Sequence, residues 1–376
     1  MKNKIKILYL TNIPSPYRID FFNELGKSCD LTVAFEGTKA TDRDDAWKGD
    51  RVRNFHVLYL NGIRTGADNF ICFDVIKLLN KKWNNIIIGV YSTPTSMLAI
   101  EYMRLCNIDY ILQSDGGFIK KDNYLKFLIK KHFIAGASIW LSTADITTDY
   151  LVHYGAIREY CYKYPFTSVT MNDIYLADRM VQKKKYFRNK LQINEDRIII
   201  SVGRFSYNKG YGKGFDVLLK CAELIDRNIG IYIIGEEPTP EFVKWKKRKQ
   251  LDNLHFIGFK TKQELQEYYA AADLFVLMTR EDIWGLVINE AIAFGLPVIT
   301  TNKCIAGLEL VKDDFNGYII PSEDVNELKN KVEYLFENKS RLIQFGKQSR
   351  KIAQNYTIEL MAEAHVKILR KYNGNM

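Results

Sequence analysis

The stretch DLFVLMTREDIWGLVINEAIAFGLPVIT, residues 273–300, decides the fold class of the second half of the chain. Its apolar run DLFVLMT (273–279) predicts a strand buried on both faces, because it lacks the polar–apolar alternation of a half-exposed strand. GLVINEAIAFG (285–295) predicts a helix and PVITT (297–301) a further strand. Strands separated by helices in this way predict a parallel sheet covered on both faces.

The same pattern recurs along both halves of the chain. Further predicted strands are IKILYL (5–10), LTVAF (31–35), NIIIGVY (85–91), DYILQSDGG (109–117), DRIIISVGRF (196–205), IGIYIIG (229–235) and LHFIGF (254–259). Predicted helices cover 19–25, 96–106, 215–225 and 262–272. We therefore predict an α/β protein of two Rossmann-like parallel-sheet domains facing a central cleft. The domains are residues 1–175 and 196–350, joined by a basic linker (176–195) and followed by a C-terminal helix (351–376).

Composition narrows the class of protein. The 376 residues are 47% hydrophobic and 26% charged, which is typical of a globular protein. No segment reaches the roughly 18 apolar residues of a membrane-spanning helix, and the first apolar run is too short for a signal peptide. Six cysteines without metal-like spacing indicate reduced thiols in a cytoplasmic protein. The net charge of +10 favours an anionic partner.

The segment after the strand 273–279 has the features of an anion site. If the helix begins near Gly285, the amides of Gly285, Leu286 and Val287 are donors at its positive end, which suits a phosphate. Asp282, before the helix, and Glu290, inside it, could each accept from hydroxyl groups on one side of that phosphate. Alternatively, Asp282 is a plain helix cap and Glu290 an exposed helix residue.

A second loop supplies positive charge. VGRFSYNKGYGKGFDVLLK (202–220) places Arg204, Lys209 and Lys213 among glycines, directly after a predicted strand. Cations at the carboxyl end of a strand would neutralise a diphosphate and stabilise it as a leaving group. The alternative is a solvated basic loop.

With these motifs in order, the chain resembles the family-4 retaining glycosyltransferases of GT-B fold, of the bacterial surface-polysaccharide type. The motifs are VGRF, KGFDVLLK, IIGEEP, FIGF, ELQEYYAAADLFV and EDIWGLVINEAIAFGLPVIT, between about residues 198 and 317. In the first half the resemblance is mostly architectural. It implies that the C-terminal helix returns to the first domain.

The resemblance also implies roles for individual residues. The family has two glutamates separated by seven residues, the first on the transferred sugar and the second on the ribose. Asp282 and Glu290 meet this spacing, with Asp in place of the first Glu, while Glu281 stands one residue too early. Arg204 and Lys213 match the cations on the diphosphate, although Lys209 is nearer the usual spacing from Arg204.

The implied reaction transfers a hexosyl or N-acetylhexosaminyl unit from a nucleotide sugar, UDP-linked on family grounds, with retention of configuration. The departing phosphate would help to deprotonate the acceptor hydroxyl. A metal is not expected because the two cations would do its work, and no other cofactor is expected. The DRD sequence at 42–44 is interpreted as a polar loop rather than a metal motif.

The first half is expected to bind the acceptor. Arg18, in NIPSPYR (12–18), could meet a phosphate, and Asp115, in SDGG (114–117), could face the sugar or the acceptor hydroxyl; a turn-forming Asp-Gly is the alternative. The loop at 12–18 lacks the glycine pattern of a nicotinamide site.

The segment KKDNYLKFLIKKHFIAGA (120–137) predicts a basic amphipathic helix, with Leu125, Leu128, Ile129 and Phe133 on one face. With the net charge, it predicts peripheral attachment to the inner face of a membrane and a lipid-linked saccharide acceptor in surface polysaccharide synthesis. An ordinary domain-covering helix is the alternative.

Two other functions remain open at this stage. One is a nucleotide-sugar epimerase of similar shape, which would need no acceptor. The other is a non-catalytic basic protein that binds membranes or nucleic acid; no RNA-binding aromatic motif is present, so no nucleic-acid partner is expected.

Overall fold

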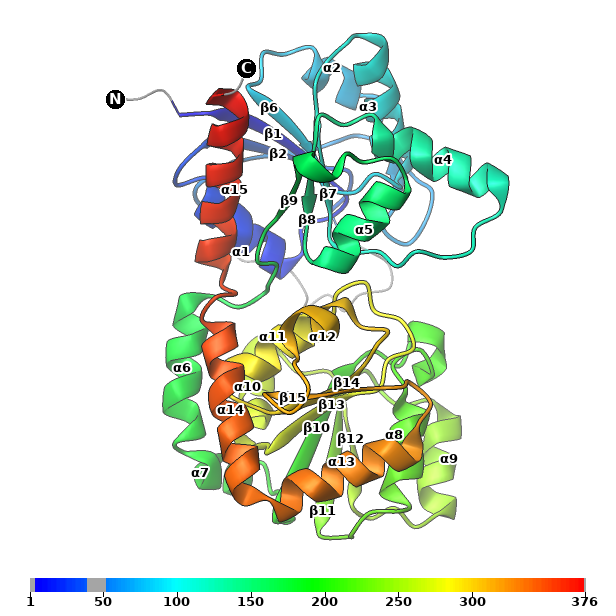
Figure 1. Cartoon of the computed structure of the whole chain (residues 1–376), viewed down its shortest axis with the longest axis vertical. Coiled ribbons are helices and arrows are strands. Elements are labelled where there is room, and N and C mark those ends of the chain that lie inside the picture. Colours follow the sequence, from blue (N-terminus) through cyan, green and yellow to red (C-terminus); the bar gives the residue numbers. More distant parts are fainter. Residues whose placement is uncertain (1–3, 39–51, 375–376) are drawn as a thin grey trace. The chain divides into compact units, whose positions relative to one another are not determined.

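The computed structural model describes residues 4–38 and 52–374, so the DRD sequence at 42–44 lies outside the described residues. The chain forms two compact units, each with its own sheet (Figure 1). Unit 1 is Met1–Ser168 with Thr357–Met376, and unit 2 is Val169–Tyr356. Unit 2 is therefore inserted between two separate parts of unit 1.

Unit 1 contains a parallel sheet in the order β3-β2-β1-β6-β7-β8-β9. Its interior strands are short apolar runs; β1, for example, is buried at five successive positions. This is the pattern of a sheet covered by helices on both faces. The strands are β1 (Lys6–Thr11), β2 (Asp30–Phe35), β3 (His56–Tyr59), β6 (Asn85–Ile88), β7 (Ile111–Ser114), β8 (Ile139–Ser142) and β9 (Cys161–Lys163).

The helices of unit 1 are α1 (Pro16–Leu25), α2 (Val75–Leu79), α3 (Pro94–Leu105), α4 (Tyr124–Ala135), α5 (Asp145–His153) and α15 (Ile358–Gly374), with a short 3₁₀ turn (Arg158–Tyr160). A small hairpin is formed by β4 (Ile63–Arg64) and β5 (Phe70–Ile71). The C-terminal helix α15 packs beside α1, and its buried His365 ring lies 4.7 Å from the Phe21 ring. Residues from the two ends of the sequence thus share one helical layer.

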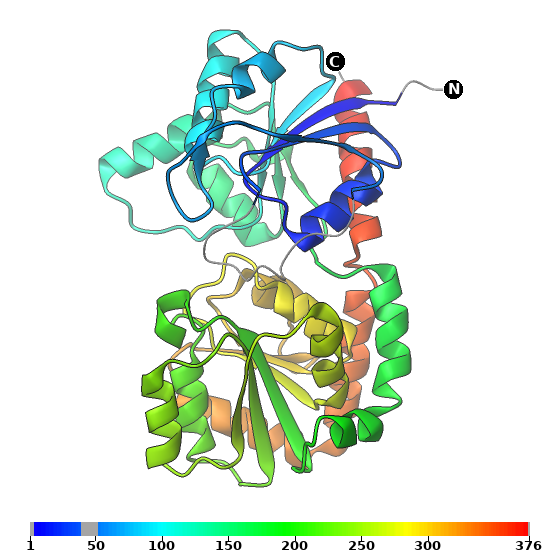
Figure 2. The same cartoon turned by 180° about the vertical axis from the view of Figure 1, so that it is seen from behind.

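Unit 2 contains a second parallel sheet in the order β12-β11-β10-β13-β14-β15. Figure 2 shows its strands with α6 and α7 along one side. The strands are β10 (Arg197–Gly203), β11 (Ile229–Gly235), β12 (Leu254–Ile257), β13 (Leu274–Leu277), β14 (Val298–Thr301) and β15 (Gly317–Ile320). The helices are α6 (Met171–Val181), α7 (Lys184–Lys190), α8 (Phe215–Ala222), α9 (Pro240–Arg248), α10 (Lys262–Ala271), α11 (Leu286–Ala293), α12 (Ile305–Leu310), α13 (Val325–Glu337) and α14 (Lys339–Ala353), with a 3₁₀ turn (Tyr207–Gly210).

The predicted fold class of two parallel-sheet α/β domains is confirmed. The stretch 176–195, expected to be a linker, lies largely within α6 and α7. Here Lys184 and Arg188 form ion pairs of 2.9 and 2.6 Å with Asp273 of unit 2. Within the described ranges, no helix combines the length and apolar character needed to cross a bilayer.

Candidate functional site

The loop between β13 and α11 holds Asp282 in a fixed position. The Asp282 N–H donates to the carbonyl of Lys303 (2.8 Å), and the Asp282 carbonyl accepts from the Ile305 N–H (3.2 Å). Close by, the buried Trp284 indole donates to the Asn289 side chain (2.8 Å). These contacts tie the loop to the segment after β14 and to α11, so the Asp282 carboxylate projects from well-held backbone.

Gly285 is required where this loop enters α11. Its φ of +99° lies in the left-handed region, and a Cβ there would lie 2.6 Å from the sulfur of Cys304. A side chain at this position would therefore be strained and would also clash. The helix that follows begins at Leu286, so its first backbone donors face the loop that carries Asp282.

Glu290, in the same helix, is positioned by a buried tyrosine of α10. The Tyr269 hydroxyl donates to the Glu290 carboxylate at 3.1 Å. Burial, followed by the charge of Glu290, raises the pKa of Tyr269 well above its ordinary value, so this hydroxyl stays protonated. The hydrogen bond fixes one carboxylate oxygen of Glu290 beside the first turns of α11.

Lys213 reaches the Asp282 carboxylate directly. Its ammonium group forms an ion pair with the Asp282 Oδ2 atom and lies 5.3 Å from the centre of the Tyr207 ring. Both partners of the pair are mostly buried. Lys209 is exposed in the turn before it, with φ of 52°, and within the described ranges its side chain makes no hydrogen bond or ion pair. Of the two lysines, Lys213 is the one that the fold joins to Asp282.

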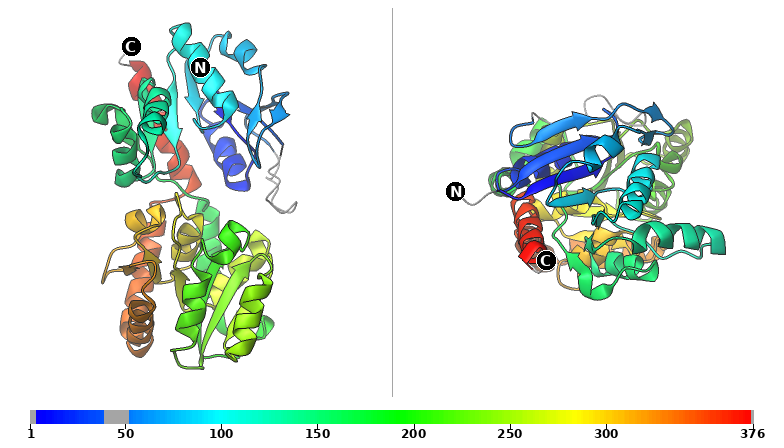
Figure 3. Two further views of the ribbon diagram at one scale, coloured as in Figure 1. Left: turned by 90° about the vertical axis from the view of Figure 1, so that its right-hand side faces the viewer. Right: turned by 90° about the horizontal axis from the view of Figure 1, so that it is seen from above.

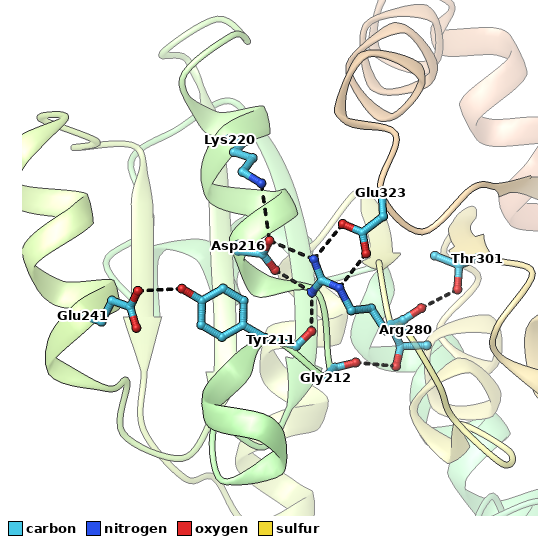
Figure 4. Close-up of polar contacts among 9 residues, drawn as sticks. Tyr211, Gly212, Asp216, Lys220, Glu241, Arg280, Thr301 and Glu323 are labelled. Carbon is cyan, nitrogen blue, oxygen red and sulfur yellow. Dashed lines mark hydrogen bonds and ion pairs between the residues drawn. The ribbon is translucent and has the colours of Figure 1, made fainter.

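Arg280, which the sequence did not single out, clamps the Lys213 loop to the end of β13 (Figure 4). Its guanidinium bonds both Asp216 oxygens (2.7 and 2.9 Å) and both Glu323 oxygens (2.6 and 2.8 Å). It also donates to the Tyr211 carbonyl, and the Arg280 N–H donates to the Gly212 carbonyl (3.0 Å). Hydrogen bonds to Asp216 raise the pKa of Arg280 further above its ordinary value. The backbone just before Lys213 is thereby fixed.

Arg204 directly follows β10, at the start of the loop that leads to Lys213. Since β10 and β13 are neighbours in the sheet, the loops after their carboxyl ends meet. The structure therefore brings the predicted cations and Asp282 to one edge of unit 2. This edge is where parallel α/β sheets usually bind ligands.

In unit 1, Arg18 and Asp115 contact each other. The Arg18 Nη2 atom lies 2.7 Å from Asp115 Oδ2, and the Arg18 Nε donates to the Tyr17 hydroxyl (3.1 Å). Burial lowers the pKa of Arg18, but Tyr17 and Asp115 outweigh burial and the pKa is raised. The other Asp115 oxygen, Oδ1, is buried without a hydrogen-bond partner in the part of the chain that the structure describes. The ion pair with Arg18 therefore fixes the position of the Asp115 carboxylate.

The sequence of unit 2 matches a known family. Residues 182–352 match the model of the family described as "Glycosyl transferases group 1". The second unit is a group 1 glycosyl transferase domain. This group 1 domain contains Arg204, Lys213, Asp282 and Glu290, which lie within the matched residues.

Relatives and solved structures agree with this family. The chain is 30% identical over 182 residues to an uncharacterized glycosyltransferase of Haemophilus influenzae, covering 47% of this chain and 50% of the relative. It is 27% identical over 130 residues to the lipopolysaccharide glucosyltransferase WaaG of Escherichia coli, covering 34% of each. The matched part thus spans about half or less of these curated relatives.

The likeness to solved structures extends over the whole chain. The structure of HepE from Anabaena in complex with UDP superposes with a TM-score of 0.77 at 15% identity, covering 98% of this chain and all of that one. At this identity the similarity concerns the fold. The fold of both units together is GT-B, as the sequence predicted.

Proposed function

We propose that the protein is a retaining glycosyltransferase. It transfers a hexosyl or N-acetylhexosaminyl unit from a UDP-sugar to a hydroxyl of a lipid-linked saccharide during surface polysaccharide synthesis. The observation that carries this proposal is the direct contact of Lys213 with Asp282 beside the start of α11. Support also comes from the relatives, one named a lipopolysaccharide glucosyltransferase and one solved with UDP.

The role of each donor-side residue follows from its charge and place. The diphosphate would be held by Arg204 and Lys213 and by the amides of Gly285, Leu286 and Val287 at the positive end of α11. Glu290, fixed by Tyr269, would accept from the ribose hydroxyls. Asp282 would accept from hydroxyls of the transferred sugar.

The reaction needs charge stabilisation more than a protein nucleophile. As the bond to the diphosphate breaks, negative charge grows on the leaving phosphate, and fixed cations and amides stabilise that charge. The acceptor hydroxyl attacks from the leaving-group side, and the departing phosphate takes its proton, so the configuration is retained. Because Lys213 contacts Asp282, its ammonium group would be held close to the place proposed here for the diphosphate.

The acceptor side is assigned to unit 1. Asp115, oriented by Arg18, has one oxygen whose hydrogen-bonding capacity is unused among the described residues. A buried carboxylate oxygen without a donor is costly unless a ligand supplies one. A hydroxyl of the sugar or of the acceptor would supply that donor.

Helix α4 supports attachment to an anionic membrane surface on the cytoplasmic side. Figure 3 shows it extending away from the sheet of unit 1. Tyr124 and Leu125 are 78% and 67% exposed, and Leu128 and Ile129 are also exposed. Phe133, expected on the same face, is instead partly buried against the core. The exposed apolar row beside Lys120, Lys121, Lys126 and Lys131 suits the boundary between headgroups and acyl chains.

The test is turnover of UDP-, GDP- and dTDP-sugars, scored by nucleotide release with and without a membrane lipid extract. We expect one UDP-sugar to be consumed only when an acceptor is present. NMR of the product should show the same anomeric configuration as in the donor. Lys213→Ala and Glu290→Ala should lose this activity, while Lys351→Ala, an exposed residue of α14, should keep it. No turnover of any donor would contradict the proposal. Nucleotide release independent of acceptor would indicate a hydrolase, and conversion of one UDP-sugar into another without nucleotide release would indicate an epimerase.

A further inference from the structure

A large basic hollow lies at the edge of unit 1 where the parallel strands begin. This hollow of about 1630 Å³ is lined by residues 4–6, 26–27, 29–31, 53–56, 83–84, 370 and 373–374. Figures 1 and 2 show the start of β1 next to the end of α15 at this place. The hollow lies at the opposite ends of the strands from Arg18 and Asp115, so it is distinct from the acceptor side proposed above.

The lining is strongly positive. Among the described residues, five cationic ones contribute, namely Lys4, Lys6, Lys27, Arg53 and Arg370, against a single lining carboxylate, Asp30. His56 lies 4.0 Å from Asp30, and Lys27 is paired with Glu24. In the described ranges, the guanidinium groups of Arg53 and Arg370 have no carboxylate within ion-pair distance. Among the described residues, most of the positive charge in the hollow therefore has no carboxylate partner.

Helix ends explain only part of this charge. The helix α1 ends here, and the Lys4 ammonium lies 3.4 Å from the carbonyl of Gly26. A cation at a helix C-terminus is stabilised by the helix dipole, which accounts for Lys4. The same effect does not account for Arg53, which precedes a strand, or for Lys6, whose ammonium lies 5.0 Å from the Trp83 ring centre.

The backbone around the two arginines is held in place. Asn373 and Asn85 exchange two side-chain hydrogen bonds of 3.0 Å, which fix the end of α15 that carries Arg370 to the sheet. The Arg53 N–H donates to the Asn23 side chain (2.8 Å). Arg53 and Arg370 thus project from different segments whose backbone is held in place. Less entropy is therefore lost when the two guanidinium groups bind a common ligand.

We propose that this hollow binds clustered phosphate groups. Guanidinium forks bind phosphate oxygens in pairs, and the lysine ammonium groups add point charges around them. The volume exceeds the roughly 300–1,000 Å³ of a usual small-molecule site, so it suits a ligand with several phosphates or a group of neighbouring headgroups. Two sources share this chemistry: a soluble polyphosphate and the surface of an anionic bilayer.

The experiment compares two double variants of the full chain that carry the same net charge. Arg53→Glu with Arg370→Glu changes the hollow, while Lys347→Glu with Lys351→Glu changes exposed lysines of α14 in unit 2. Each pair replaces two positive by two negative charges. Binding of inorganic tripolyphosphate is measured by calorimetric titration. Flotation is measured with vesicles of phosphatidylcholine alone and with phosphatidylglycerol added.

We expect the wild type and the α14 variant to bind tripolyphosphate, anionic vesicles or both, and the hollow variant to bind at least about tenfold more weakly. The binding should also weaken as salt is raised from roughly 0.05 to 0.5 M, because ions screen the charges. Binding of tripolyphosphate identifies a soluble ligand, and binding of anionic vesicles alone identifies lipid headgroups. Arg53→Gln with Arg370→Gln, which is milder for folding, should reproduce the loss with an unchanged melting temperature.

Equal weakening in both charge-reversal variants would overturn the proposal, because it would reflect net charge alone. Absence of binding to either ligand by the wild type would also overturn it. Vesicle binding that the hollow variant keeps in full would be assigned to α4 and, without tripolyphosphate binding, would overturn the proposal as well. The donor-side residues lie in unit 2 and are unchanged in the hollow variants, so donor turnover is tested separately.

Discussion

Replacing Arg280 with methionine should destabilise unit 2 and weaken donor binding. The Asp216 side chain is only 4% exposed, and without Arg280 its remaining ion-pair partner among the described residues would be Lys220 at 3.5 Å. Leaving a buried carboxylate largely unpaired costs about 3–5 kcal/mol. Lys220 remains, and Glu323 is 62% exposed and adds little, so we expect the lower end, about 3 kcal/mol.

The assay is calorimetry of the full chain with and without UDP. For a unit of this size, 1 kcal/mol corresponds to roughly 2–4 °C in melting temperature, so the transition of unit 2 should fall by about 6–12 °C. Because the Arg280 guanidinium also donates to the Tyr211 carbonyl, two residues before Lys213, the affinity for UDP should fall as well. Glu323→Gln, the matched control, should change stability by less than about 1 kcal/mol.

A double variant separates the buried charge from lost packing. With Asp216→Asn added to Arg280→Met, no charge is left buried, so the double variant should be more stable than Arg280→Met alone. The reasoning is refuted if Arg280→Met melts within about 2 °C of the wild type. It is equally refuted if the two substitutions simply add.

Three further results are expected. Burial raises the pKa of Glu36 to about 7 from 4.5, which lowers stability as pH rises between these values, whereas burial lowers the pKa of His365 to about 4 from 6.5, which raises stability over that range. These opposing slopes, each about 1.4 kcal/mol per pH unit, should nearly cancel in the wild type from about pH 4.5 to 6.5. In urea unfolding over this range, the stability of Glu36→Gln should rise with pH and the stability of His365→Asn should fall. Two flat profiles would contradict this. Gly285→Ala, strained by its positive φ and by contact with a buried sulfur, should lose about 1–3 kcal/mol of stability and bind UDP more weakly in titration, and wild-type affinity would show that this loop does not bind the donor. Tyr124→Ser with Leu125→Ser should reduce flotation with anionic vesicles without changing the melting temperature, and unchanged flotation would remove α4 from the membrane contact.

The fold class was predictable because its signal is local. Runs such as IIISV (198–202) are apolar without alternation, and the structure buries all five residues in β10. The strands β3, β8, β9 and β15 were not predicted, because their short runs show no usable periodicity. The helix α7 was also hidden, because its lysines and arginines resemble a solvated linker. Two of its ion pairs are made with Asp273, more than 80 residues away in sequence.

The candidate site was predictable as a set of strand-end loops, but not as a network. The contact of Lys213 with Asp282 joins residues 69 positions apart, and it follows only from the adjacency of β10 and β13. The Arg280 clamp on Asp216 spans 64 positions for the same reason. The spacing of the motif left Lys209 and Lys213 as alternatives, and backbone geometry separates them. The roles of all these residues in binding and catalysis stay predictions until the variants are measured.

The return of α15 to unit 1 has a consequence for how the protein is made. A ribosome completes residues 169–356 before it completes Thr357–Met376, so unit 2 can finish folding first. Until α15 emerges, the face of α1 that includes Phe21 has no covering helix and exposes apolar surface. The nascent chain therefore passes through a stage with one finished unit and one open unit. Chaperone binding at that stage should concentrate on unit 1, although unit 1 is the first to be translated.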